Sequence, residues 1–273
     1  MNLGLEGKHA LVTGGSRGIG YGVAQVLAAE GCNLHLASRS AESLNAARKR
    51  LQAACEVDVT THACDLSDSA NVVSLARDCS GMDILVNNAG AIPQGTIELD
   101  ETTWREAWDL KVFGFIALTR EVYREMCSAK RGVIVNVLGN AGERPLPNYV
   151  AGSMANSALM TMTRVMGAES IRHGVRIVAV SPGYIETDRQ IVRWKARAKE
   201  QLNDENRWRE LTAVFPLGRL GSVDEVANTV VFLASDRSSY TSGAIVTIDG
   251  GFSQRAAQIK DCLLYTSPSP RDS

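Results

Sequence analysis

Short apolar segments alternate with amphipathic stretches of helical length along most of the chain. Seven of these apolar segments have the length of strands, at residues 9–13, 34–38, 59–64, 84–87, 133–138, 176–181 and 244–248. Nearly continuous apolar strands joined by helical crossovers are typical of a parallel sheet with helices on both faces. The pattern therefore predicts the α/β class, with a doubly wound parallel sheet of about seven strands. No linker or internal repeat interrupts the alternation, so we expect a single domain over residues 1–255.

A glycine-rich segment, TGGSRGIG at residues 13–20, follows the first predicted strand and precedes an amphipathic run at 21–29. Gly14 and Gly15 permit the backbone angles of a sharp turn into a helix. Side chains at Gly18 and Gly20 would keep a pyrophosphate away from the start of that helix, where free N–H groups and the helix dipole attract anions. An ordinary strand–helix turn also collects glycine, but the strand before it and the helix after it favour a dinucleotide site.

The end of the second predicted strand indicates which dinucleotide is bound. An acidic residue at this point bonds the ribose 2′-hydroxyl of NAD, whereas an arginine accommodates the 2′-phosphate of NADP. Ser38 stands where the acid would be, Arg39 follows it, and Arg17 in the glycine segment adds a second positive group. Guanidinium groups make paired, charge-assisted hydrogen bonds to such an oxyanion. We therefore expect NADP rather than NAD, the alternative being two solvated surface arginines.

Composition and charge exclude several other classes of protein. The chain has 273 residues, 45% of them hydrophobic, and a formal net charge of −1, which argues against nucleic acid or an anionic membrane as the main partner. It has no apolar run of membrane-spanning length and no signal-peptide pattern, so we expect a cytoplasmic protein. Six cysteines form no CxxC pair, and His62 with Cys64 lacks a second pair to complete a tetrahedral site. We expect no metal.

The C-terminal end of the chain differs from the rest. Residues 256–273 form a tail, of which residues 262–273, CLLYTSPSPRDS, resemble the in-frame translation of a sequencing-library adapter. We expect this segment to be non-native and exclude it from the predicted fold. The alternative is a genuine end rich in serine and proline. Neither interpretation gives the tail a function.

Several further motifs follow the glycine segment in a fixed order. They are Asp65-Leu66, NNAG at 87–90, Tyr149, Pro182-Gly183, Thr187 and Asp249-Gly250-Gly251. With TGGSRGIG they resemble the short-chain dehydrogenase/reductase family over residues 5–255. The resemblance implies a Rossmann-type fold in which glycines line the pyrophosphate, Asp65 bonds the adenine and Thr187 anchors the nicotinamide. The cofactor-binding residues expected from the loop and the resemblance are Gly14, Ser16, Arg17, Gly18, Ile19, Gly20, Ser38, Arg39, Asp65, Leu66, Asn88, Ala89, Gly90, Tyr149, Pro182, Gly183, Ile185 and Thr187. Simple turn chemistry is the alternative for the NNAG and Pro-Gly loops.

The catalytic positions depart from the pattern of this family. In the family, a tyrosine gives a proton and a lysine four residues later supports that tyrosine. A serine orients the carbonyl, and an asparagine supports a water relay. Tyr149 matches the tyrosine. The lysine position is Ser153, the serine position falls at Gly139 with Asn140 beside it, and the asparagine position is Lys111. An amide such as Asn140 can orient a carbonyl in place of a hydroxyl. The candidate catalytic residues are therefore Tyr149, Lys111, Asn140 and Ser153.

The missing lysine bears on the direction of the reaction. Reaching the tyrosine anion at neutral pH costs about 4 kcal/mol without a nearby cation. The loss of this cation should matter less for a neutral tyrosine that acts as an acid, so ketone reduction is favoured over oxidation. We hypothesise that Lys111 supplies the missing cation from another helix. The alternative is a lysine that extends to the surface or pairs with Asp109.

Two further segments concern the substrate and the partners. Residues 187–220 carry many arginines and lysines around Trp194 and Trp208, so they either cover an acidic substrate or form a solvated helix pair with acidic neighbours. The helix expected at 149–172 is low in charge on more than one face, and the resemblance implies pairing through it in a homotetramer or dimer.

We expect an NADP(H)-dependent oxidoreductase that interconverts a ketone and a secondary alcohol, 3-oxoacyl reductase-like or another carbonyl reductase. The alternatives are a weak or inactive NADP-binding sensor or structural subunit, and an enzyme of the same fold that oxidises a dihydrodiol.

Overall fold

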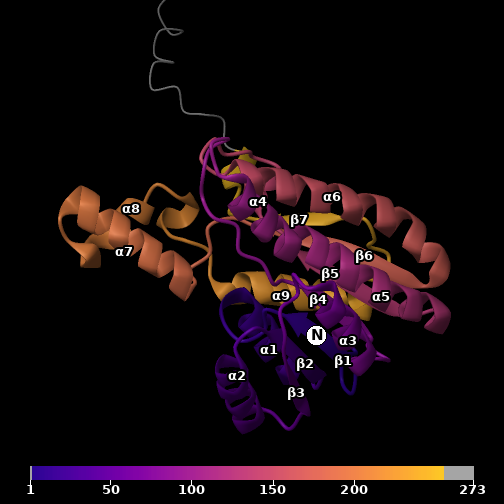
Figure 1. The fold of residues 1–273 in the computed structure, drawn as a ribbon. Helices are drawn as coiled ribbons and strands as arrows, with labels where there is room; N and C mark the ends of the chain where they lie inside the picture. The colour runs from indigo at the N-terminus through magenta and orange to yellow at the C-terminus, as the bar shows by residue number, and fades with distance from the viewer. Residues whose placement is uncertain (1, 255–273) are drawn as a thin grey trace, which may run out of the picture.

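One parallel sheet forms the centre of the protein (Figure 1). The computed structural model describes residues 2–254. The strands are β1 (His9–Thr13), β2 (Asn33–Ser38), β3 (Val59–Ala63), β4 (Ile84–Asn87), β5 (Gly132–Val137), β6 (Val175–Pro182) and β7 (Ile245–Ile248). They lie in the order β3-β2-β1-β4-β5-β6-β7, and every adjacent pair is parallel. The predicted fold class is confirmed, and each predicted strand is found within one residue of its expected ends.

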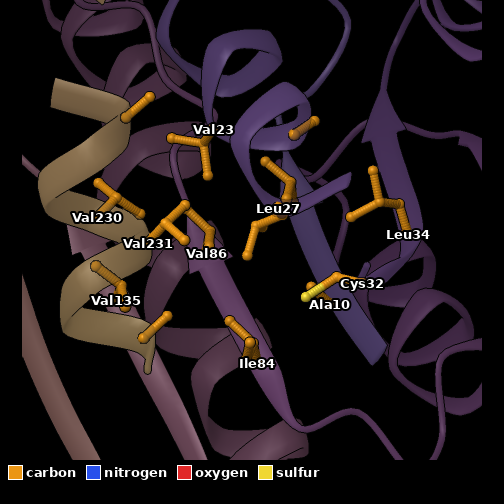
Figure 2. Packing of buried hydrophobic residues seen from close by; sticks show 14 of the residues in the cluster. Ala10, Val23, Leu27, Cys32, Leu34, Ile84, Val86, Val135, Val230 and Val231 are labelled. Atoms are coloured by element: carbon orange, nitrogen blue, oxygen red, sulfur yellow. The ribbon is translucent and has the colours of Figure 1, made fainter. Parts of the chain in front are cut away.

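Helices cover both faces of the sheet, which is why its central strands β1, β4, β5 and β6 are buried and largely apolar. One face packs against α1 (Gly18–Ala29), α2 (Ala41–Ala54) and α9 (Val223–Ala234). Figure 2 shows Val23 and Leu27 of α1 beside Val230 and Val231 of α9, above Val86 of β4. The other face packs against α3 (Ser69–Asp78), α5 (Gly114–Ala129) and α6 (Val150–Ser170).

The strand order reverses between β1 and β4, the point at which doubly wound sheets bind ligands at their carboxyl edge. A chain of buried side-chain hydrogen bonds holds the neighbouring strands together. The Nδ2 of Asn87 donates to Thr119 and to Asn136, each at 3.0 Å, and the Nδ2 of Asn136 donates to Thr163 at 3.0 Å. These hydrogen bonds therefore hold in place the strand ends from which the loops after β1 and β4 begin.

Two segments depart from the regular alternation. Helix α4 (Glu101–Trp108) runs into a π-helical turn (Asp109–Phe113) that continues as α5. Helices α7 (Asp188–Leu202) and α8 (Trp208–Thr212) stand to one side of the sheet (Figure 1) and bury Trp194 and Trp208 against Phe215. Short 3₁₀ turns lie at Asn140–Gly142, Ile171–His173, Glu205–Arg207, Pro216–Gly218, Asp236–Ser238 and Phe252–Gln254.

Within residues 2–254, none of the helices has both the length and the apolar character needed to cross a membrane. The tail predicted at 256–273, with its adapter-like segment at 262–273, lies outside the described residues.

Candidate active site

The glycine turn after β1 has the shape that an anion cradle requires. Gly14 has φ +65° and Gly18 has φ +57°, a region that favours glycine, and a β-carbon on Gly20 would overlap the carbonyl oxygen of Gly14. A β-carbon on Gly18 would meet only Thr187, at 3.6 Å. No side chain caps the start of α1, so its first N–H groups remain available to a phosphate. Ser16 is buried beside this turn and Ile19 is half-buried.

The loop after β4 is tied directly to the glycine turn. The Oγ1 of Thr13 accepts hydrogen bonds from the backbone N–H groups of Asn88 at 2.9 Å and Ala89 at 3.0 Å. The Nδ2 of Asn88 donates to the carbonyl oxygen of Thr13 at 2.9 Å. A side chain at Gly90 would overlap Lys111, so the loop lies directly against the π-helical turn. The fold thus brings the predicted pyrophosphate and ribose loops together.

The ends of β2 and β3 supply polar groups beside the glycine turn. The Oγ of Ser38 is buried and has no hydrogen-bond partner within residues 2–254, and Arg39 is exposed. Asp65 accepts hydrogen bonds from the N–H and hydroxyl of Ser67 at 3.0 and 2.8 Å, which hold the pKa of its carboxyl below its usual value. Leu66 is buried. An orphaned hydroxyl next to an arginine fits the ribose end of a phosphorylated dinucleotide.

Four arginines gather near this edge of the sheet, and two of them were not among the predicted site residues. Desolvation by burial, and after it the positive charges of Arg193, Arg17 and Arg39, lower the pKa of Arg189 in α7. None of the four forms an ion pair with a residue in the described part of the chain. In the sequence, only the many arginines in the segment that forms α7 indicated that Arg189 and Arg193 could belong to the site. Like charges held together without a carboxylate attract an anion.

Tyr149 stands immediately before α6 and within reach of the charges of two arginines of α7. It packs against a buried apolar cluster that contains Ile92, Val112 and Ala151, and its hydroxyl makes no hydrogen bond to the residues described. Burial raises the pKa of this phenol, while Arg193 and Arg189 act in the opposite direction. The hydroxyl is therefore protonated at neutral pH and available to a ligand.

Ser153, at the position expected for the lysine, supports the backbone. Its buried Oγ accepts a hydrogen bond from the N–H of Leu146 at 3.1 Å. This contact ties the loop before Tyr149 to the first turn of α6.

Asn156 lies beside the position expected for the serine, although it was not among the candidate catalytic residues. A β-carbon on Gly139 would lie 3.2 Å from the Nδ2 of Asn156. That Nδ2 donates to the carbonyl oxygen of Gly152 at 2.9 Å, and the Oδ1 is buried with no partner in residues 2–254. Its spacing of about two helical turns from Tyr149 was the available signal.

Asn140 is held by the C-terminal part of the described chain. Its Nδ2 donates to the Oδ2 of Asp249 at 3.4 Å and to the Oγ of Ser253 at 3.2 Å. A β-carbon on Gly183 would lie 3.3 Å from the same nitrogen, so the loops after β5, β6 and β7 meet here. The Asn140 side chain thus organises this end of the site.

Lys111 is buried in the π-helical turn. Its Nζ donates to the carbonyl oxygen of Val137 at 2.8 Å and lies 4.3 Å from the centre of the Phe115 ring. Burial lowers the pKa of this amine to about 7. The surface-exposed or Asp109-paired alternative is therefore wrong, because the amine is buried and no ion pair joins the two among the described residues. No hydrogen bond to Tyr149 is present within the same residues, and its action on that phenol stays a prediction.

The loop after β6 carries the residues expected to meet the nicotinamide. Pro182 ends the strand, and the N–H of Gly183 donates to Ile248 at 3.0 Å. Ile185 is buried, and the Oγ1 of Thr187 accepts from the N–H of Gln190 at 3.4 Å as the N-cap of α7. Among residues 2–254 this hydroxyl donates no hydrogen bond, so its proton is available to a ligand.

The predicted cofactor residues lie at the last residues of strands, on the loops that follow at the carboxyl edge of the sheet, or at helix starts. Glycines with positive φ in the turn, arginines without an ion pair in residues 2–254 and an orphaned serine hydroxyl fit a phosphorylated dinucleotide. Of the four candidate catalytic residues, Tyr149 alone presents a side-chain hydroxyl or amine without a hydrogen-bond partner in residues 2–254.

Comparison with known proteins places this geometry in a family. Residues 14–253 match the family described as Enoyl-(Acyl carrier protein) reductase. The chain is 34% identical to galactitol 2-dehydrogenase (L-tagatose-forming) of Cereibacter sphaeroides, covering 91% of this chain and 96% of that protein. It is 31% identical to the 3-oxoacyl-[acyl-carrier-protein] reductase FabG of Chlamydia trachomatis, covering 90% and 98%. The structure of L-sorbose reductase from Gluconobacter frateurii with NADPH and L-sorbose has a TM-score of 0.88 at 30% identity, covering 94% and 100%. The chain belongs to the short-chain dehydrogenase/reductase family of oxidoreductases, which act on CH–OH groups.

Proposed function

We propose that the protein is an NADP(H)-dependent carbonyl reductase that interconverts a ketone and a secondary alcohol, with reduction favoured. The observation that carries the proposal is the partly buried Tyr149 phenol, on which the charges of Arg193 and Arg189 act, two arginines that have no acidic partner in residues 2–254. An anionic cofactor would neutralise the arginines, and the phenol is the proton donor that carbonyl reduction requires.

The choice of NADP rests on the end of β2. A 2′-phosphate would find the Ser38 hydroxyl and the Arg39 and Arg17 guanidinium groups on one side of the glycine turn. No acidic side chain stands at the end of this strand to bond an unmodified ribose. The turn at Gly14, Gly18 and Gly20 would hold the pyrophosphate on the first N–H groups of α1.

Bound NADPH would supply the hydride to the carbonyl carbon. The residues of this chain then act on the oxygen. Tyr149 donates its phenolic proton as the oxygen gains charge, and desolvation keeps that proton in place at neutral pH until a ligand accepts it. Arg189 and Arg193 stabilise the phenolate that remains. In this scheme the two arginines supply the cation that the missing lysine would have given.

A catalytically weak NADP-binding protein is the second candidate, and a specific observation favours it. Gly139 has no hydroxyl, the Ser153 hydroxyl is bound by the backbone, and the Lys111 amine is directed at Val137. Three of the four groups expected around the substrate are therefore absent or occupied. Such a protein would bind the cofactor through the same loops and convert no ketone.

An assay with purified protein separates the two candidates. NADPH is mixed with representative ketones, namely a 3-oxoacyl thioester, a ketose and a cyclic diketone, while nicotinamide absorbance and tryptophan fluorescence are followed. The proposal predicts cofactor oxidation with at least one ketone. Fluorescence quenching by NADPH without oxidation of the cofactor by any class of ketone would favour the binding protein instead.

We also infer assembly into a homotetramer or dimer through α6. The exposed side chains Met154 and Val165 on this helix and Phe113 at the start of α5 are apolar, which supports burial against a second copy of the chain. Light scattering coupled to gel filtration tests this inference. A monomer mass at micromolar concentration would contradict it.

A further inference from the structure

Three side chains that can bind metals converge on the face of the sheet covered by α3. In the pairing of β2 with β3, Ala37 stands opposite His62, and side chains alternate along a strand, so His35 and His62 share a face. Cys79 directly follows α3 and is buried over the same face. One ligand atom from each of these three residues lies within 4.8 Å of the other two. The reductase chemistry proposed above uses none of them.

The distances between the ligand atoms are close to those around a tetrahedral zinc ion. The Sγ of Cys79 lies 3.4 Å from the Nδ1 of His35 and 3.5 Å from the Nε2 of His62. The two nitrogens are 2.9 Å apart. Bond lengths of about 2.0 Å to nitrogen and 2.3 Å to sulfur place N and S about 3.5 Å apart and two nitrogens about 3.3 Å apart. The sulfur distances already match, and the two rings need to separate by only about 0.4 Å.

The surroundings of the cluster also suit a cation. Burial lowers the pKa of both His35 and His62, so each ring is neutral at pH 7 and keeps a nitrogen lone pair. Burial, and after it the Asp78 carboxylate, raise the pKa of the Cys79 thiol to about 12, so a metal ion would have to displace this proton. Without a metal, one imidazole N–H is hydrogen-bonded to the other ring. Binding would release that hydrogen bond and displace the thiol proton of Cys79.

We propose that His35, His62 and Cys79 form a binding site for a divalent transition metal of the zinc class, with water in the fourth position. Two imidazoles and one thiolate are borderline and soft ligands that favour zinc over magnesium or calcium. The sequence alone pairs only His62 with Cys64. Folding replaces that pair with a set drawn from two strands and the end of a helix.

The test uses the full-length, fully reduced protein and zinc or cobalt ions alone. We expect one zinc per chain by elemental analysis after dialysis, and a rise in the thermal midpoint on adding zinc. Cobalt should produce the visible bands of a tetrahedral site and a thiolate charge-transfer band. His62→Gln and Cys79→Ser should each weaken binding at least tenfold and remove the charge-transfer band or change its intensity.

The controls are Cys55→Ser and His173→Gln, which change the same residue types outside the cluster and should bind zinc as the wild type does. Because Cys79 is buried, His35→Gln provides a second route if Cys79→Ser fails to fold. Absence of stoichiometric zinc binding by the reduced wild type would overturn the proposal. Equal binding by the wild type, His62→Gln and His35→Gln would also overturn it, because the metal would then sit on other groups.

Discussion

The ring of Tyr149 lies over the α-carbon of Gly152, and a β-carbon at residue 152 would overlap the Cε1 and Cζ atoms of that ring. The phenol therefore reaches its position because the helix surface one turn later carries no side chain. Gly152 thus sets the orientation of the proposed proton donor while touching no reacting atom.

Substituting Gly152 by alanine should push the Tyr149 ring aside. We expect kcat for ketone reduction to fall on the order of 10- to 100-fold, because a displacement of about 1 Å costs that much in an oriented site. NADPH affinity should stay within about twofold, since the glycine turn is untouched. Steady-state kinetics and cofactor titration measure both quantities. Glu169→Gln, an exposed change on the same helix, is the control and should keep both values. A Gly152→Ala enzyme with wild-type kcat would show that the ring position is unimportant.

Arg39 should discriminate between the two nicotinamide cofactors. Removing a charge-assisted contact of about 1.5–3 kcal/mol predicts a 10- to 150-fold weaker Kd for NADPH in Arg39→Ala, with the Kd for NADH unchanged. Fluorescence titration with each cofactor provides the measurement. Arg207→Ala, which removes an exposed arginine paired with Glu210, should alter neither Kd. Equal losses for both cofactors would argue against a 2′-phosphate contact.

Buried Lys111 should make stability depend on pH. Its pKa is lowered from 10.5 to about 7, so between these values the unfolded chain binds a proton that the folded chain does not. Stability contributed by this group is therefore present above pH 10 and lost as pH falls toward 7, by up to about 1.4 kcal/mol per unit.

Lys111→Met should remove that slope, so that its free energy of unfolding exceeds that of the wild type by more at pH 7 than at pH 9. Denaturant titrations at the two pH values measure this difference, with exposed Lys199→Met as the control. The same variant tests the catalytic hypothesis. A large loss of turnover with retained cofactor binding would support a role for the amine near Tyr149, and unchanged turnover would end it. Identical pH slopes in wild type and Lys111→Met would contradict the assignment of a neutral buried amine.

The protonation state of the Tyr149 phenol should also determine how the rate of reduction depends on pH. Because desolvation raises its pKa, the group stays protonated through neutral pH, and kcat for reduction should remain flat until the pH exceeds about 10. Oxidation of the alcohol, which needs the anion, should instead rise with pH. Rates measured in both directions from pH 6 to 11 test this. An inflection of the reduction rate near pH 7 would point to another donor, such as Lys111.

The strands and the loops at their carboxyl ends could be predicted from the sequence because buried parallel strands are apolar throughout and glycine turns are local signals. Contacts between distant segments could not. The alternation of apolar and charged residues around Lys111 does not reveal that its amine is directed at Val137. The approach of Arg189 to Arg17, and of Cys79 to His35, depends on how α7 and α3 pack, which no spacing in the chain encodes. The role of Ser153, which stands where the lysine was expected, likewise could not be predicted from the sequence. It follows from the hydrogen bond that the Ser153 hydroxyl accepts from the N–H of Leu146.

The most direct test of the account is the rate of ketone reduction by Tyr149→Phe, which deletes one oxygen and keeps the ring over Gly152. We predict that kcat falls by a factor on the order of 100 to 10,000 while the Kd for NADPH is unchanged. A Tyr149→Phe enzyme that reduces the same ketone at the wild-type rate would contradict the assignment of this hydroxyl as the proton donor.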